Sequence, residues 1–273
     1  MSTKGKTLNW HFTTACNFDC RYCFIAPCRS LGLAEYKTAL EKIAPHFSRV
    51  NFVGGEPTVS PHLLPLMRLA RSLSLDCTIV TNGYNVIRDK ALFTEIASLC
   101  SCIGISVDSL NDETNAKIGR AHNGEIISRS EYVDLCKAIK NSGTRLKINT
   151  VVSSLNKDED FSAFYREINP DRIKLFQVLK PERCLKHCYD NFLINQAEFA
   201  SFVARHGEFS SKIVAENNDA MTSAYYMLDA ECCFIDEKRG GKSPSIARSD
   251  VSAEYALTFA DVDAEKYNFR YIA

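Results

Sequence analysis

No apolar run in this 273-residue sequence approaches the ~20 consecutive residues that a membrane-spanning helix needs. Residues 1–6 are polar, no apolar signal segment follows them, and no basic amphipathic helix precedes the first apolar run. We therefore expect a soluble, cytoplasmic protein with no membrane partner.

The sequence also has no excess of charge of either sign, because 33 basic residues balance 33 acidic ones. Proteins that bind nucleic acids or anionic membrane surfaces normally carry a basic excess, so we expect neither partner. A polyanionic ligand would have to be met by a local cluster of cations. The chain has no low-complexity segment and no internal sequence repeat.

The sequence lacks a second C-x2-C pair after the three closely spaced cysteines Cys16, Cys20 and Cys23. A zinc knuckle normally has such a second pair. These cysteines come directly after the apolar run Leu8 to Phe12. Three thiolates on one loop can hold three irons of a 4Fe–4S cube and leave the fourth iron open to a ligand. The alternatives are a structural zinc site and three unrelated core cysteines, and the spacing favours the cluster.

The other cysteines are expected to bind no metal. A second site could be built from Cys184 and Cys188, which flank His187, together with Cys232 and Cys233, but auxiliary clusters use more cysteines at tighter spacing. Cys28 is expected to be unligated. The remaining four are expected to be small core residues in a reducing compartment: Cys77, Cys100, Cys102 and Cys136.

Short β-branched runs alternate with helix-like segments, a pattern typical of βα units around a parallel sheet. The expected strands are Leu8–Thr13, Val50–Val53, Cys77–Thr81, Cys102–Val107, Leu146–Val152 and Ile173–Leu179. The expected helices lie near Ala34–Ala44, Pro61–Ser74, Lys90–Leu99, Ser130–Asn141 and Glu159–Glu167. The pattern predicts an α/β fold, a partial (βα)6 TIM-type barrel over residues 1–180.

Residues 181–273 are less regular and are expected to form a C-terminal extension that closes the active site. Helices are expected at Gln196–Arg205 and Asp219–Asp229, before a loop at Gly240-Gly241. A partial barrel is open on one side, and no other part of the chain is placed to cover it and exclude water.

Chemistry in parallel barrels gathers at the carboxyl ends of the strands, where this sequence carries polar and glycine-rich groups. The second expected strand ends in Gly54, Gly55 and Glu56, where paired glycines allow a close backbone approach and the carboxylate could accept an ammonium group. Asn82 and Ser106 follow the third and fourth strands and could bond a ribose or an adenine edge. Each group alone could equally be a corner or a helix cap.

The loop Cys16-Asn17-Phe18-Asp19-Cys20-Arg21-Tyr22-Cys23, with Gly-Gly-Glu-Pro about thirty residues later, resembles the radical S-adenosylmethionine (SAM) enzymes. The resemblance implies that Cys16, Cys20 and Cys23 hold a 4Fe–4S cluster whose open iron binds S-adenosylmethionine. It also implies that Gly54, Gly55 and Glu56 contact the methionine amino group and that Asn82 and Ser106 contact the adenosyl moiety.

The sequence is similar to the viperin family over about Leu8 to Arg248. The segments that carry this resemblance are residues 9–13 (NWHFT), 51–57 (NFVGGEP), 115–120 (NAKIGR), 147–149 (KIN) and 172–177 (RIKLFQ). It implies dehydration of a nucleoside triphosphate (CTP, UTP or GTP) to the 3′-deoxy-3′,4′-didehydro analogue, a chain-terminating antiviral nucleotide. It also implies a monomer served by an electron donor such as flavodoxin or ferredoxin.

Two positions depart from the animal viperins and leave the nucleobase open. Arg49 stands where those proteins have lysine, and Val53 stands where they have serine.

Cations on two neighbouring expected strands predict a phosphate site. Side chains two apart on a strand share a face, so Lys147 lies with Asn149, and Arg172 lies with Lys174. If both faces point into the barrel, a polyanion is the natural partner of such buried charges. The viperin resemblance adds three further substrate contacts: Arg49, Asn51 and Arg120. The alternative for each cation is an outward position on the barrel surface.

No proton donor stands out in the sequence. Tyr225 and Tyr226 lie in the expected covering extension and are the candidates, although packing is the common role of such tyrosines.

Two other functions compete with nucleotide dehydration. A radical enzyme that acts on a peptide or another small molecule would need a peptide-binding domain or additional clusters. A non-catalytic nucleotide-binding protein would keep the cluster only as a structural element, and the Gly54-Gly55-Glu56 segment speaks against it.

Overall fold

The computed structural model describes residues 5–179, 189–236 and 239–271. An eight-stranded sheet runs in the order β7-β6-β5-β4-β3-β2-β1-β8, and all neighbouring strands in it are parallel. Its strands are β1 (Thr7–Thr13), β2 (Arg49–Gly54), β3 (Asp76–Thr81), β4 (Cys100–Ser106), β5 (Arg145–Val152), β6 (Arg172–Gln177), β7 (Ile213–Glu216) and β8 (Tyr226–Leu228). A small antiparallel pair is formed by β9 (Ile235–Asp236) and β10 (Gly241–Lys242).

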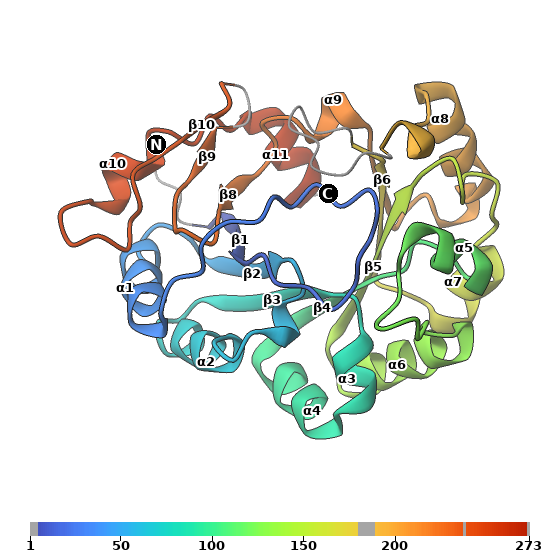
Figure 1. Ribbon diagram of the computed structural model, residues 1–273, viewed down its shortest axis with the longest axis horizontal. Helices are drawn as coiled ribbons and strands as arrows, with labels where there is room; N and C mark the ends of the chain where they lie inside the picture. Colours follow the sequence, from blue (N-terminus) through green and yellow to red (C-terminus); the bar gives the residue numbers. More distant parts are fainter. Residues whose placement is uncertain (1–4, 180–188, 237–238, 272–273) are drawn as a thin grey trace.

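Helices cover the outer, convex side of the curled sheet, as Figure 1 shows for α1, α2, α4, α6 and α7. The helices are α1 (Leu33–Ile43), α2 (Leu63–Ser72), α3 (Tyr84–Arg88), α4 (Lys90–Leu99), α5 (Asp112–Ile118), α6 (Arg129–Asn141), α7 (Ser162–Ile168), α8 (Gln196–Arg205), α9 (Asn218–Met221), α10 (Ala253–Leu257) and α11 (Ala264–Tyr271). This arrangement confirms the predicted partial barrel.

The core lies between the helices and the convex face of the sheet. On β1, the fully buried Trp10 and Phe12 pack edge-to-face with Tyr36 of α1, at ring-centroid distances of 5.7 Å and 6.3 Å. Such pairs contribute about 0.5–1.5 kcal/mol beyond the burial of their area. Helix α6 begins where Ser128 and Glu131 form a capping box, and it buries Tyr132, Leu135 and Ile139 among other residues.

The concave face of the sheet is polar. Along β5 the side chains of Leu146, Ile148 and Thr150 are buried, whereas the alternate residues Lys147 and Asn149 are partly exposed. A Cβ atom on Gly104, the β4 partner of Lys147, would lie 2.7 Å from the Lys147 Cε. The glycine therefore makes room for the lysine inside the barrel.

The six strands predicted before residue 180 are confirmed to within two residues at each end. The expected helix over Asp219–Asp229 is wrong, because only Asn218–Met221 is helical there and Tyr226–Leu228 is a strand. Residues after 181 also supply β7, which pairs with β6, and β8, which pairs with β1. The tail thus provides both edge strands, and its role as a cover stays a prediction.

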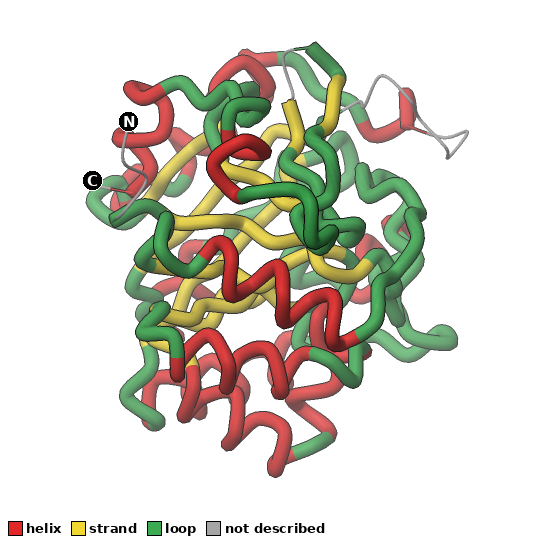
Figure 2. Tube along the Cα trace, turned by 90° about the vertical axis from the view of Figure 1, so that its left-hand side faces the viewer, coloured by secondary structure: helices red, strands yellow, loops and turns green. Residues whose placement is uncertain are grey.

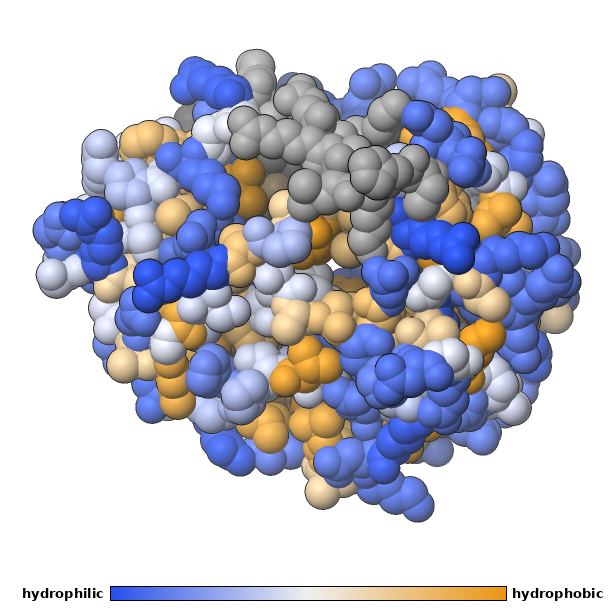
Figure 3. All heavy atoms as spheres, viewed as in Figure 1, coloured by the Kyte–Doolittle hydropathy of each residue, from blue (hydrophilic) through white to orange (hydrophobic). Residues whose placement is uncertain are grey.

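The first strand and the last helix meet at the amino-terminal end of the sheet, because the Thr7 backbone N–H donates a 2.6 Å hydrogen bond to the Tyr267 hydroxyl of α11. Figure 2 shows most of the loops at the opposite end. The face seen in Figure 3 is hollowed near its middle, with apolar residues beside the hollow and hydrophilic ones around the periphery. In the described part of the chain no helix is long and apolar enough to span a membrane.

Candidate active site

The loop that carries Cys16, Cys20 and Cys23 leaves β1 and is hydrogen-bonded directly to the end of β2. The backbone N–H of Gly55 donates to the Thr13 carbonyl, and that of Glu56 donates to the Ala15 carbonyl, both at 2.8 Å. A Cβ atom on Gly54 or Gly55 would lie 2.2 Å from a carbonyl oxygen of this loop, and Gly54 has a φ of 137°. Only glycine allows the two segments to approach so closely.

The carboxylate of Glu56 is 1% exposed and is held by groups within the protein. It accepts hydrogen bonds from the Thr58 backbone and hydroxyl, the Thr81 hydroxyl and the Asn82 backbone N–H, at 2.6–3.0 Å. Burial raises the pKa of this carboxyl, while these donors oppose the shift. Glu56 therefore ties the end of β2 to the end of β3, and its predicted contact with S-adenosylmethionine stays a prediction.

Asn82 lies at the end of β3 and reaches across to the cysteine loop. Its amide nitrogen donates a 2.7 Å hydrogen bond to Asn17 Oδ1, and its own oxygen accepts from the Tyr84 backbone N–H at 3.0 Å. The Ser106 carbonyl, at the end of β4, accepts a 2.7 Å hydrogen bond from Arg120. The ends of β2, β3 and β4 thus present the expected cofactor-binding residues around one loop.

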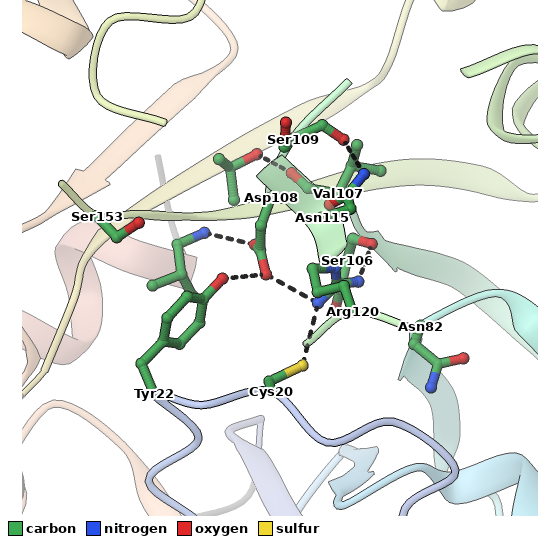
Figure 4. Close-up of polar contacts among 12 residues, drawn as sticks. Cys20, Tyr22, Asn82, Ser106, Val107, Asp108, Ser109, Asn115, Arg120 and Ser153 are labelled. Atoms are coloured by element: carbon green, nitrogen blue, oxygen red, sulfur yellow. Dashed lines mark hydrogen bonds and ion pairs between the residues drawn. The ribbon is translucent and has the colours of Figure 1, made fainter. Parts of the chain in front are cut away.

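Arg120 lies against this loop in a buried network with Asp108 and Tyr22 (Figure 4). Its guanidinium donates to Asp108 Oδ2 at 2.8 Å and to the Cys20 sulfur at 3.9 Å, and the Tyr22 hydroxyl donates to the same carboxylate oxygen at 2.7 Å. All three side chains are less than 10% exposed. Burial alone would lower the pKa of Arg120, but the Asp108 carboxylate raises it well above its usual value.

This network was not predicted in full from the sequence. Neither Asp108 nor Tyr22 was assigned a role from the sequence. Arg120 was expected to contact substrate, and that role stays a prediction. The structure adds a contact between its guanidinium and a thiol of the loop.

The thiols of Cys16 and Cys20 need added positive charge to ionise. Burial raises the pKa of Cys20 to about 12 and also raises the pKa of Cys16, while nearby Arg120 lowers both. An iron–sulfur cluster supplies such charge, so the donor set and its surroundings fit a metal cluster. Among the described residues, no three His, Cys, Asp or Glu side chains, these included, are gathered closely enough to hold a metal ion.

Lys147 and Asn149 lie side by side with Arg172 and Lys174 on the concave face, because the strand register pairs Lys147 with Arg172 and Asn149 with Lys174. Burial lowers the pKa of the Lys147 ammonium, for which no hydrogen-bond or ion-pair partner exists within the described residues. The Asn149 Oδ1 atom is likewise buried without a partner in that part of the chain. Both groups are placed to meet a polar ligand.

Lys174 has partners within the protein. Its ammonium lies 2.6 Å from the Glu216 carboxylate of β7 and donates a 2.8 Å hydrogen bond to the Tyr225 hydroxyl. Arg172 donates to the Arg270 carbonyl of α11. Glu216 and Arg270 were not singled out from the sequence, since neither belongs to a motif.

Of the other expected substrate contacts, Asn51 lies on the concave face, where its amide donates to Asn9 and its oxygen accepts from the Thr78 hydroxyl, both at 2.8 Å. Arg49 begins β2 and forms a 2.6 Å ion pair with Asp76. Arg49 is therefore at the amino-terminal end of the sheet, away from the cysteine loop.

The two candidate tyrosines lie in different surroundings. The Tyr225 hydroxyl contacts both members of the Lys174–Glu216 pair, because it accepts a hydrogen bond from Lys174 and donates one to Glu216. Tyr226 packs on Phe47 at a ring-centroid distance of 5.5 Å and accepts a 2.8 Å hydrogen bond from Lys6. No disulfide joins the described cysteines. Cys184, His187 and Cys188 lie outside the described residues, so the second-site alternative is not addressed by the structure.

Comparisons with known proteins agree with this arrangement. Residues 10–168 match the Radical SAM superfamily. A protein from Flammeovirga pacifica named S-adenosylmethionine-dependent nucleotide dehydratase is 34% identical over 96% of this chain and 92% of its own length. A protein of the same name from Psychrobacter lutiphocae is 32% identical, with 99% and 96% covered. The Oncorhynchus mykiss protein named S-adenosylmethionine-dependent nucleotide dehydratase RSAD2 is 32% identical, with 97% and 79% covered.

Solved structures show the same fold at low sequence identity. Streptococcus suis SuiB bound to S-adenosylmethionine has a TM-score of 0.69 at 13% identity and covers 97% of this chain and 67% of its own. The protein anSMEcpe, with bound S-adenosylmethionine and a peptide, has a TM-score of 0.66 at 15% identity, with 97% and 82% covered.

Proposed function

The chain belongs to the S-adenosylmethionine-dependent nucleotide dehydratases, the viperin family within the radical SAM superfamily, and on this basis we propose that it dehydrates a nucleoside triphosphate. The product is the 3′-deoxy-3′,4′-didehydro nucleotide, and the substrate is CTP, UTP or GTP. The observation that carries the proposal is a pair of polar groups, Lys147 and Asn149, that lie beside Lys174 on the concave face and have no partner among the described residues. These groups leave a place for an anionic ligand within the barrel.

In this proposal Cys16, Cys20 and Cys23 hold a 4Fe–4S cluster. The backbone of Gly54 and Gly55, with Glu56, Asn82 and Ser106, positions S-adenosylmethionine beside it. When bound, the cluster and S-adenosylmethionine would supply a 5′-deoxyadenosyl radical, which can take the hydrogen atom from C4′. With one added proton the 3′ hydroxyl leaves as water, and one further electron from the reductant completes the C3′–C4′ double bond. Arg120 keeps the loop in place through Asp108 and presents positive charge to the Cys20 sulfur.

Lys147, Arg172 and Lys174 bind the phosphates, with Asn51 and Asn149 as polar contacts on the same face. Arg49, at the far end of β2, would reach only the distal part of a ligand that extends along the barrel axis. Of the two tyrosines, Tyr225 is the better candidate for the donor of the proton with which the 3′ hydroxyl leaves as water, since its hydroxyl lies beside the Lys174 ammonium.

We further propose that the protein acts in the cytoplasm as a monomer and receives electrons from a flavodoxin or ferredoxin. The segment 181–273 is proposed to complete and cover the site. The contacts of Tyr225 and Glu216 with Lys174 support this role.

The test is anaerobic reconstitution followed by mixing with S-adenosylmethionine, dithionite and each nucleoside triphosphate in turn. Formation of 5′-deoxyadenosine that depends on one of the triphosphates is the expected result. Nucleotide binding without any turnover would instead favour a non-catalytic binding protein. Cleavage stimulated by peptides but not by nucleotides would favour a peptide-modifying enzyme.

A further inference from the structure

Glu216, the last residue of β7, is a fully buried carboxylate shared by three groups from different elements. The Lys174 ammonium lies 2.6 Å from it, the Arg270 guanidinium of α11 lies 2.8 Å from it, and the Tyr225 hydroxyl donates a hydrogen bond to it. Both charged groups also lie 5.0 Å from the centroid of the Tyr225 ring. One carboxylate thus fixes two cations and a phenol.

Glu216 compensates only part of the positive charge in this region. Lys174 also faces Lys147 of β5 and Arg172 of β6, and both lower its pKa. Burial is the largest effect and, with these neighbours, brings the pKa of Lys174 down to about 8, while Glu216 acts in the opposite direction. Without the carboxylate, the same burial and the same cations would favour the neutral amine more strongly.

We propose that Glu216 is a positioning residue of the nucleotide site: it holds the ammonium of Lys174 and the phenol of Tyr225 inside the barrel, and Arg270 of the C-terminal helix holds Glu216 in turn. The proposal rests on the proposed function, because it takes Lys174 as a phosphate contact. It assigns to α11 a part in substrate binding, although this helix also contacts the amino-terminal end of β1 through Tyr267.

The proposal is tested by the pH dependence of CTP binding, with UTP and GTP in parallel. Cluster-loaded protein is titrated with the nucleotide in an anaerobic calorimeter, with S-adenosylmethionine present and no reductant, so that no turnover occurs. Dissociation constants of Glu216→Gln and of the wild type are compared between about pH 6 and about pH 8.5, the range that brackets the Lys174 pKa. Protonation of the nucleotide cancels in the ratio of the two constants.

The ratio of the Glu216→Gln constant to the wild-type constant should rise with pH and approach about tenfold at the upper end of the range, if the pKa of Lys174 falls by about one unit. The ratio of the Arg270→Gln constant to the wild-type constant should instead fall with pH. In that variant Glu216 is no longer shared with Arg270, so it stabilises the charged form of Lys174 more strongly. The control Glu208→Gln removes an exposed carboxylate paired with Arg166 and should leave the ratio constant. Thermal unfolding of each variant checks that it is folded.

A ratio independent of pH in Glu216→Gln would show that Glu216 only packs and would overturn the proposal. Tighter nucleotide binding by Glu216→Gln at every pH would also overturn it, because Glu216 would then compete with the phosphates. If Glu216→Gln does not fold, the proposal is overturned when the ratio of the Arg270→Gln constant to the wild-type constant is independent of pH. A wild type that binds none of the three triphosphates would instead refute the proposed function itself.

Discussion

Lys147 and Lys174 are adjacent cations whose charges are compensated differently. Lys174 is paired with Glu216, whereas the Lys147 ammonium has no partner in the described parts of the chain. A charge-assisted hydrogen bond contributes about 1.5–3 kcal/mol, so Lys147→Ala or Lys174→Ala should lower kcat/KM for the triphosphate by roughly ten- to a hundredfold.

The control for the lysine variants is Lys137→Ala, on the outer face of α6, where the side chain is paired with Glu167 and half exposed. Its steady-state kinetics should match the wild type. Equal turnover of mono- and triphosphates by the wild type, with unchanged kinetics in both interior variants, would remove phosphate binding from these lysines.

Cys16→Ala, Cys20→Ala and Cys23→Ala should each abolish the visible absorption of the reconstituted cluster and the cleavage of S-adenosylmethionine, because two thiolates do not hold the cube. Cys28→Ala, in the same loop, is the matched control and should retain both. A Cys28→Ala protein without a cluster would mean that the ligands are assigned wrongly.

The sequence shows a residue's chemistry more readily than its partners. Lys147 and Lys174 could be placed on one face from their spacing, because the period of a strand is fixed. Glu216 could not be matched to Lys174 from the sequence, because the two residues are 42 positions apart. Their contact depends on the pairing of β6 with β7, which no sequence motif predicts. Tyr225 and Tyr226 are equivalent in sequence and are separated only by the direction in which each side chain points.

The cysteine loop is held by two elements that approach it from opposite sides. The end of β2 bonds its first residues through Gly55 and Glu56, and on the other side the Arg21 backbone N–H donates a 2.8 Å hydrogen bond to the Ile118 carbonyl of α5. Gly119 allows this second approach, because a Cβ atom there would lie 2.3 Å from the Asp19 carbonyl oxygen.

Gly55→Ala should therefore displace the loop and prevent cluster loading, because the added methyl group would lie 2.2 Å from the Ala15 carbonyl oxygen. Iron content and visible absorption after reconstitution provide the measurement. Gly207→Ala is the control, since no heavy atom lies within 4 Å of its added Cβ. Equal iron content in the two variants would contradict the proposed support of the loop by β2.

Asp108→Asn should destabilise the protein by about 3–5 kcal/mol, because it leaves the buried Arg120 charge without its ionic partner. Urea unfolding of the protein without its cluster measures this change. Asp250→Asn removes one partner of an exposed pair with Arg248 and should leave the unfolding midpoint unchanged. An unchanged midpoint for Asp108→Asn would show that the network does not hold the loop.

At the scale of elements, long periodic segments were predicted well and short ones were not. The strands β1 to β6 have six to eight residues and separate clearly from the amphipathic helices between them. β7 and β8 have four and three residues, which are too few for an alternating pattern to be recognised. β8 also lies within a segment whose composition predicted a helix.

On the scale of the whole molecule, the tail completes the sheet as well as contributing to the site. Its strands β7 and β8 cover the edges of β6 and β1, and α11 joins the amino-terminal end of the sheet. Three cations, Lys147, Arg172 and Lys174, lie together on the concave face, and Glu216 compensates only part of their charge. An anionic substrate is then attracted by the interior of the barrel rather than by its surface.

The activity that we propose for this chain is removal of a hydrogen atom from C4′ of a nucleoside triphosphate and expulsion of its 3′ hydroxyl. The most direct measurement uses CTP, UTP and GTP that each carry deuterium at C4′, with reconstituted enzyme, S-adenosylmethionine and dithionite, followed by mass spectrometry. We expect deuterium in the 5′-deoxyadenosine and a nucleotide product that is lighter than its substrate by the lost deuterium and the lost hydroxyl, with no hydrogen added. Deoxyadenosine that contains no deuterium with any of the three nucleotides would contradict it.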